Sequence, residues 1–120
     1  MAMGVTTLFV EVVNPAMPEV TERLEFIVDS GSVFSVVPTE VLRRLGVQPR
    51  EQQTFRLANN AHIVRWRGGA FFKFREYAGV AEVIFGEEGD ATLLGAHTLE
   101  AFGLGLDPIK RELRPVPLTL

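Results

Sequence analysis

A lone carboxylate between two apolar runs is the feature that most constrains how this chain can fold. The stretch FIVDSGSVFSVVP covers residues 26–38, and Asp29 is its only charged residue. Segments this apolar are typical of buried strands. A carboxylate that is removed from water costs free energy unless it is hydrogen-bonded, paired or protonated. We therefore expect Asp29 to be either well satisfied by its neighbours or used in chemistry.

The length and composition predict a single domain that covers residues 1–120. Of the 120 residues, 47% are hydrophobic and 22% are charged, which is typical of a folded globular protein. The absence of cysteine excludes disulfides, thiolate metal ligands and cysteine nucleophiles. A net charge of −3 gives no general attraction for nucleic acid or an anionic membrane. No segment resembles a signal peptide or a membrane span, so we expect a cytoplasmic protein.

Short apolar segments between turn residues predict a mostly-β chain. The turn signals include residues 14–18, whose two prolines cannot continue a sheet ladder, and Gly68-Gly69, which breaks the strand pattern. The strands expected between such signals cover residues 5–14, 21–28, 54–57, 62–66, 70–76, 80–85 and 92–94, with one more after residue 103. Many short strands of this kind favour a barrel-like β domain.

Two short helices complete the expected elements. Residues 39–45 carry an apolar stripe, with Thr39 as the candidate N-cap and Gly46 as a stop. The second helix covers residues 96–102 and ends at Gly103. Both halves of the chain thus run from an apolar strand through a turn to a short helix and a glycine, and only the first half carries the acid.

Three motifs together resemble the retropepsin-like aspartic proteases, the single-domain relatives of retroviral proteases that also occur in bacteria and archaea. Asp29-Ser30-Gly31-Ser32 is similar to their Asp-Thr/Ser-Gly-Ala/Ser signature, and Leu93-Leu94-Gly95 to the two-apolar-plus-glycine motif behind the active-site loop. Ala58-Asn59-Asn60 resembles the tip of their flap hairpin. Smaller matches to the bacterial and archaeal members are Ser35, Pro38, Leu99-Glu100 and Leu106-Asp107-Pro108. The resemblance extends from about residue 8 to 113 and implies a closed β-barrel with one or two short helices.

The resemblance implies a catalytic role for Asp29 and a supporting role for Ser30, Gly31 and Ser32 in the loop. Such enzymes hold a water between two carboxylates, of which one is ionised and the other keeps its proton. One motif in one domain means that the second aspartate comes from a second copy of the chain, so the implied enzyme is a homodimer. Its substrate is a peptide or protein, and it uses no metal or cofactor.

The chain also departs from the family pattern. Retroviral members pair an acid after the signature with an arginine after the late glycine, whereas Val33 and Ala96 stand at these positions. The expected flap tip carries two asparagines where glycine is common. We expect Val33, Phe34 and Ile63 to face the substrate pockets, and the dimer contacts to differ from those of the viral enzymes.

Other readings of these residues remain open. Asp29 could form an Asx-type turn without a catalytic task, and the chain could be a non-catalytic peptide-binding or assembly module with the protease fold. No Gly-x-Ser-x-Gly motif surrounds the serines, and neither His62 nor His97 has the spacing of a metal ligand. Asp107 is expected to have a structural role.

A basic cluster follows the expected flap. Arg65, Arg67, Lys73 and Arg75 alternate with Trp66, Phe72 and Phe74. Such a mixture can bind nucleic acid, but alternation also arises on the solvated face of a β-ribbon. Because the overall charge is negative, we favour the solvated face and expect the phenylalanines in the core.

Overall fold

The computed structural model describes residues 6–107 and 109–117 of the chain. Val5, expected at the start of the first strand, and Pro108 lie outside these residues. In chain order the elements are β1 (Thr7–Asn14), β2 (Met17–Val28), β3 (Ser35–Pro38), α1 (Thr39–Leu45), β4 (Glu51–Arg56), β5 (His62–Phe74), β6 (Tyr77–Gly86), β7 (Leu93–Leu94), α2 (Ala96–Phe102), β8 (Leu104–Leu106) and β9 (Leu113–Pro115). The expected mostly-β chain with two short helices is confirmed.

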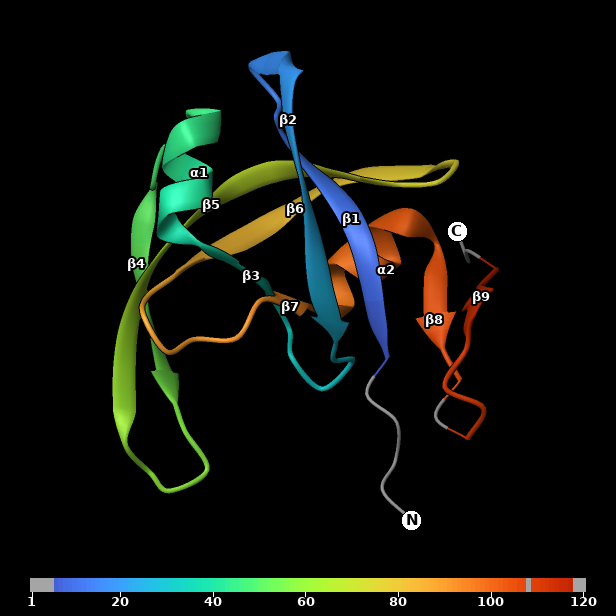
Figure 1. The fold of residues 1–120 in the computed structure, drawn as a ribbon. Coiled ribbons are helices and arrows are strands. Elements are labelled where there is room, and N and C mark those ends of the chain that lie inside the picture. Colours follow the sequence, from blue (N-terminus) through green and yellow to red (C-terminus); the bar gives the residue numbers. More distant parts are fainter. Residues whose placement is uncertain (1–5, 108, 118–120) are drawn as a thin grey trace.

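The main sheet has seven strands in the order β1-β2-β7-β3-β6-β5-β4. Strand β1 also pairs with β5, through Glu11↔Lys73, Val12↔Phe72 and Val13↔Phe71. The pairing therefore runs through six strands and returns to β1, and β4 lies outside this circuit, beside β5 (Figure 1). In the described part of the chain, β4 pairs with no other strand. Strands β8 and β9 form a separate two-stranded sheet.

The core lies where the strands and both helices meet. Phe26 on β2 and Phe72 on β5 are fully buried and pack edge to face, with ring centroids 6.3 Å apart. Helix α1 adds Leu42 and Leu45, and α2 adds Leu99. Burying such side chains contributes about 1.5–3 kcal/mol each. Strand β2 is thereby fixed up to Val28, the residue before Asp29.

Both helices end as the sequence indicates, but α1 begins differently. Each helix has seven residues and ends at a glycine in the left-handed conformation, Gly46 with φ of 81° and Gly103 with φ of 75°. Thr39 is not the N-cap of α1, because Pro38 holds that position and the Thr39 hydroxyl donates to the Gly86 carbonyl at 2.8 Å. Among the described residues, no helix is long and apolar enough to cross a membrane.

One turn signal in the sequence is wrong and another is partly right, because the turn expected over residues 14–18 forms at Pro15 and Ala16 but Pro18 belongs to a strand. Gly68-Gly69 lies inside the continuous strand β5, and a Cβ at Gly68 would lie 2.6 Å from the Gln48 carbonyl oxygen. That glycine permits a close approach of two backbones and does not interrupt the strand. Pro18 lies inside β2, where the register with β1 shifts and a regular ladder hydrogen bond is not needed.

Candidate active site

Strand β7 lies between the two strands that carry the Asp29 loop. Strand β2 pairs with β7 in parallel through Val28↔Leu94, and β3 pairs with it antiparallel through Val36↔Leu93. The Asp29 N–H donates to the Leu94 carbonyl at 3.0 Å. The two apolar residues of the Leu93-Leu94-Gly95 motif thus sit beside the base of the loop.

The Asp29 side chain is exposed in the single chain, although Val28 before it is buried. Strand β2 ends at Val28, so the chain leaves the core at Asp29. The Gly31 N–H donates to Asp29 Oδ1 at 3.0 Å, and the Ser32 N–H donates to the Asp29 carbonyl at 3.1 Å. These contacts form an Asx-type turn. The carboxylate keeps one oxygen without a partner among the described residues.

Gly95 lets helix α2 approach the loop closely. A Cβ at Gly95 would lie 2.5 Å from both the carbonyl carbon and the oxygen of Phe34. The Ala96 N–H donates to the Ser32 carbonyl at 2.7 Å, and the His97 N–H donates to the Val33 carbonyl at 3.1 Å. The first N–H groups of a helix have no partner within it. Carbonyl groups of the loop accept hydrogen bonds from two of these N–H groups in α2. The loop and the start of the helix therefore hold each other in place.

A buried hydroxyl pair supports the same loop from behind. Ser35 and Thr98 are fully buried, and their hydroxyl oxygens lie 2.5 Å apart. Ser35 Oγ also accepts the Gly95 N–H at 2.9 Å, so the polar groups satisfy one another. The sequence did not single out Thr98. The signal that could have found it is a threonine at a core-facing position of α2, together with a serine in an apolar run.

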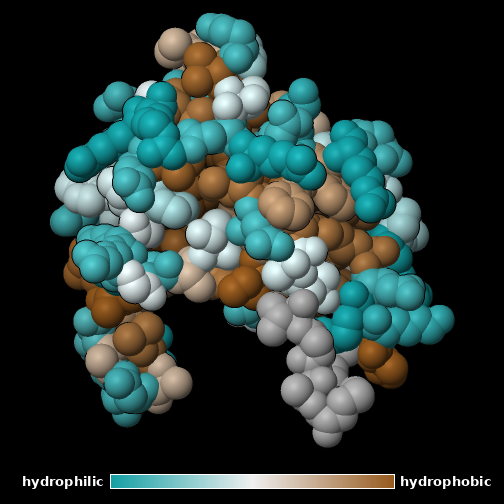
Figure 2. Space-filling model, viewed as in Figure 1, coloured by the Kyte–Doolittle hydropathy of each residue, from teal (hydrophilic) through white to brown (hydrophobic). Residues whose placement is uncertain are grey.

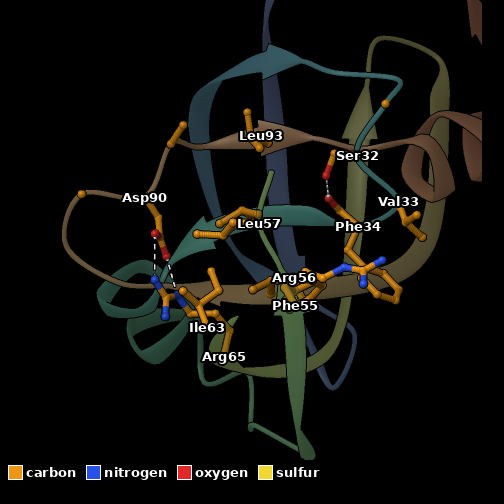
Figure 3. A pocket seen from close by; sticks show the side chains of 15 residues that line it. Ser32, Val33, Phe34, Phe55, Arg56, Leu57, Ile63, Arg65, Asp90 and Leu93 are labelled. Carbon is orange, nitrogen blue, oxygen red and sulfur yellow. Dashed lines mark hydrogen bonds and ion pairs between the residues drawn. The ribbon is translucent and has the colours of Figure 1, made fainter. Parts of the chain in front are cut away.

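A pocket of about 510 Å³ opens beside the loop (Figure 3). The expected pocket residues Val33, Phe34 and Ile63 all line it. The other lining residues are Gly31, Ser32, Val36, Phe55, Arg56, Leu57, Arg65, Ile84, Gly89, Asp90, Ala91 and Leu93. Loop 29–34, the β4–β5 hairpin and the loop between β6 and β7 therefore enclose one mainly apolar pocket.

Two of the pocket residues form an ion pair that the sequence did not indicate. Arg65 Nε lies 2.7 Å from Asp90 Oδ2, and Arg65 Nη2 lies 2.9 Å from Asp90 Oδ1. The hydrogen bonds from Arg65 lower the pKa of the Asp90 carboxyl from its ordinary value, and the Glu87 N–H contributes. The pair joins β5 to the loop that precedes β7 (Figure 3).

The predicted solvated basic face is wrong for two of its four members. The side chains of Arg65 and Arg67 are 15% and 21% exposed, whereas Trp66 between them is 45% exposed. Arg67 Nε donates to Glu82 at 2.9 Å, and its guanidinium carbon lies 5.0 Å from the centre of the Phe34 ring. Lys73 is exposed as expected. Arg65 and Arg67 point inward because their acidic partners lie on β6 and in the following loop, which local alternation does not reveal.

The β4–β5 hairpin turns at Ala58-Asn59-Asn60, as expected. Asn60 has a φ of 68°, a conformation that asparagine tolerates, and Asn59 Oδ1 accepts the Ala61 N–H at 2.9 Å. The hairpin projects from the body of the molecule and leaves a hollow beside it (Figures 1 and 2). Its use as a flap stays a prediction.

Comparisons with known proteins identify the fold. No family model matches the sequence, and no curated protein matches it either. Among solved structures, the chain is similar to the "Solution structure of Simian Foamy Virus (mac) protease", with a TM-score of 0.51 and 18% sequence identity. The match covers 78% of this chain and 92% of that one. The fold is retropepsin-like.

Within the retropepsin-like fold, the loop and α2 are joined without the acid–arginine pair of the retroviral enzymes. Neither Val33 nor Ala96 can form an ion pair. In this chain, backbone bonds run from α2 to the loop, and the Phe34 ring packs edge to face on His97 with centroids 5.5 Å apart. This connection is carried by main-chain and aromatic contacts.

Asp107 has the structural role that the sequence predicts. Asp107 organises the β8–β9 turn, where Oδ1 accepts the Ile109 and Lys110 N–H groups and Oδ2 lies 2.6 Å from Arg114. The two backbone donors lower the pKa of the Asp107 carboxyl from its ordinary value. Among the described residues, no group of histidine, aspartate and glutamate side chains could hold a metal ion.

Proposed function

We propose that the chain is an aspartic endopeptidase that is active as a homodimer, with one Asp29 from each copy. In the dimer the two carboxylates face each other, and a water lies between them. One carboxylate takes a proton from this water, while the other keeps its proton and polarises the scissile carbonyl. Two carboxylates about 3 Å apart cannot both ionise, so the pair titrates as a unit.

One observation carries this proposal. In a retropepsin-like fold, an exposed Asp29 carboxylate stands on a rigidly held loop beside a large apolar pocket. A purely structural Asx turn needs neither the exposure nor the pocket. An exposed carboxylate with an oxygen free is available to a second copy, whereas one satisfied on all sides would not be.

The neighbouring residues take supporting roles in this proposal. The Gly31 N–H orients the Asp29 carboxylate, and Ser30 bonds to the same loop of the partner. The pocket receives a substrate side chain, and Ala58-Asn59-Asn60 at the hairpin tip covers the bound peptide. An extended peptide adds strand-like backbone hydrogen bonds to such hairpins.

Cleavage of an unfolded protein by the wild-type chain and by Asp29→Asn, at matched concentrations from acidic to neutral pH, tests the proposal. We expect cleavage by the wild type alone, with a rate that rises more steeply than linearly with protein concentration. Equal product patterns from the two proteins would indicate a contaminating protease. A folded wild-type dimer that cleaves nothing would contradict the enzymatic function.

A second candidate is a non-catalytic module that binds peptides or partner proteins. The edge position of β4 favours it, because within residues 6–107 and 109–117 this strand pairs with β5 alone, and an exposed edge can accept an added strand from another chain. This candidate predicts that Asp29→Asn binds peptides as the wild type does and that neither protein cleaves them.

A further inference from the structure

The pocket beside the Asp29 loop contains charged groups that an apolar pocket does not need. Three of its lining residues, Arg56, Arg65 and Asp90, carry charge. Arg56 is exposed, whereas the side chains of Arg65 and Asp90 are only 15% and 25% exposed. A guanidinium and a carboxylate that are largely removed from water are costly unless each is paired.

The Arg65 guanidinium is fully engaged by its surroundings. Asp90 accepts from Nε and Nη2, the Val64 carbonyl accepts from Nη1 at 3.0 Å, and Glu87 Oε1 lies 3.7 Å from Nη1. Asp90 Oδ2 also accepts the Glu87 N–H at 2.8 Å. Every nitrogen of the guanidinium therefore has a partner in the protein, and this wall of the pocket offers neither a free charge nor an unused nitrogen.

We propose that the Arg65–Asp90 ion pair makes this pocket select uncharged, apolar side chains of a bound peptide, with Asp90 as the specificity-determining residue. The inference rests on the proposed function, in which the pocket receives a peptide side chain. Loss of the Asp90 carboxylate removes the two closest acidic contacts of Arg65 and leaves the exposed Glu87 carboxylate, 3.7 Å away, as its remaining counter-charge. Such a site gains most from an acidic side chain, because a guanidinium binds a carboxylate with two parallel hydrogen bonds.

Two variants of the pair give opposite expectations. Asp90→Asn removes the charge and keeps the side-chain size, so the preference moves towards acidic side chains. The double variant Arg65→Met with Asp90→Leu replaces both charges by apolar groups, so the preference for apolar side chains returns. The second variant separates a change of charge from a general loss of structure in the loop.

A matched control breaks an ion pair elsewhere in the molecule. Glu22 pairs with Arg44 between β2 and α1, and neither residue lines the pocket. Glu22→Gln removes one carboxylate of an ion pair, as Asp90→Asn does. We expect it to leave the peptide preference of the pocket unchanged.

Binding measurements test the inference without any need for activity. The probes are fluorescent octapeptides of alanine in which Leu, Glu or Lys is moved through the interior positions, and the protein is the full chain with Asp29→Asn. With the ion pair intact, we expect the Leu peptides to bind more tightly than the Glu and Lys peptides. In Asp90→Asn, the affinity ratio of Glu to Leu rises about tenfold at one position, which corresponds to about 1.4 kcal/mol. An unchanged ratio in a folded Asp90→Asn protein, or no binding by the intact pocket, overturns the inference.

Cleavage-site mapping separates this inference from the proposed function. Peptides from an unfolded protein mixture are digested by the wild type and by Asp90→Asn, and the residues around each cut are identified by mass spectrometry. Cleavage by both with the same side-chain preference overturns the role of Asp90 and leaves the protease function standing. No cleavage by the wild type counts against the protease function, while the peptide affinities still decide the role of Asp90.

Discussion

At the residue scale, Gly95 lies where α2 begins and the Asp29 loop passes. Its backbone is so close to the Phe34 carbonyl that a Cβ would overlap it. We expect Gly95→Ala to lower the free energy of unfolding by about 1–3 kcal/mol, because backbone on one side and a helix on the other leave little room to relax. Chemical denaturation followed by circular dichroism measures this loss.

Gly69 provides the control for this substitution. A Cβ at Gly69 would meet no atom within 4 Å, and the residue lies in the middle of β5. Gly69→Ala should therefore change the free energy of unfolding by no more than about 0.5 kcal/mol. Equal losses in the two variants would show that the close approach of α2 to the loop does not limit stability.

At the element scale, ion pairs hold the β4–β5 hairpin to the rest of the molecule, so its attachment depends on pH. Hydrogen bonds from Arg65 lower the pKa of the Asp90 carboxyl, and hydrogen bonds from Arg50, then Arg67, lower the pKa of the Glu82 carboxyl. Both ion pairs thus stabilise the folded chain at any pH above the ordinary carboxyl range, about 4. This stabilisation is lost as the pH falls through the lowered folded-state values.

Trp66, the one tryptophan of the chain, reports on this change from within the hairpin. We expect its fluorescence to shift to longer wavelength as the pH falls below about 4, while the hairpin loosens. Asp90→Asn should reduce the amplitude of this shift. Asp107→Asn serves as the control, because Asp107 also has a lowered pKa but belongs to the β8–β9 turn. A full shift in Asp90→Asn would contradict the role of this ion pair.

The secondary structure was largely predictable from local sequence, and the contacts between elements were not. The helix ends at Gly46 and Gly103 follow from local chemistry, and so does the turn at Asn59-Asn60. The prediction for Gly68 was wrong because a glycine is needed there to let the backbone of Gln48 come close. Local sequence pattern does not show that these two segments are neighbours. Likewise the partners of Arg65 and Arg67 come from β6 and the loop after it. The pocket was anticipated only through the family resemblance.

At the scale of the whole molecule, the proposed enzyme has no complete active site in one chain. When wild type and Asp29→Asn are mixed in equal amounts and allowed to exchange, roughly a quarter of the dimers carry two intact aspartates. Activity at fixed total concentration should therefore fall to about a quarter of the unmixed wild-type value. If the mixture keeps half of the wild-type activity, each chain acts alone. That result would contradict an active site shared between two copies.

The bonds between α2 and the Asp29 loop lie within one chain, and this has a consequence for how activity would be controlled. In the proposed enzyme, a newly made chain would carry its half of the site before it meets a second copy, since Gly95, Ser35 and the first amides of α2 already hold the loop. Encounter between copies, and not refolding of the loop, would then set the onset of proteolysis. Dilution would inactivate the enzyme by separating the copies, and a higher concentration would restore activity. Neither change would require the Asp29 loop to refold.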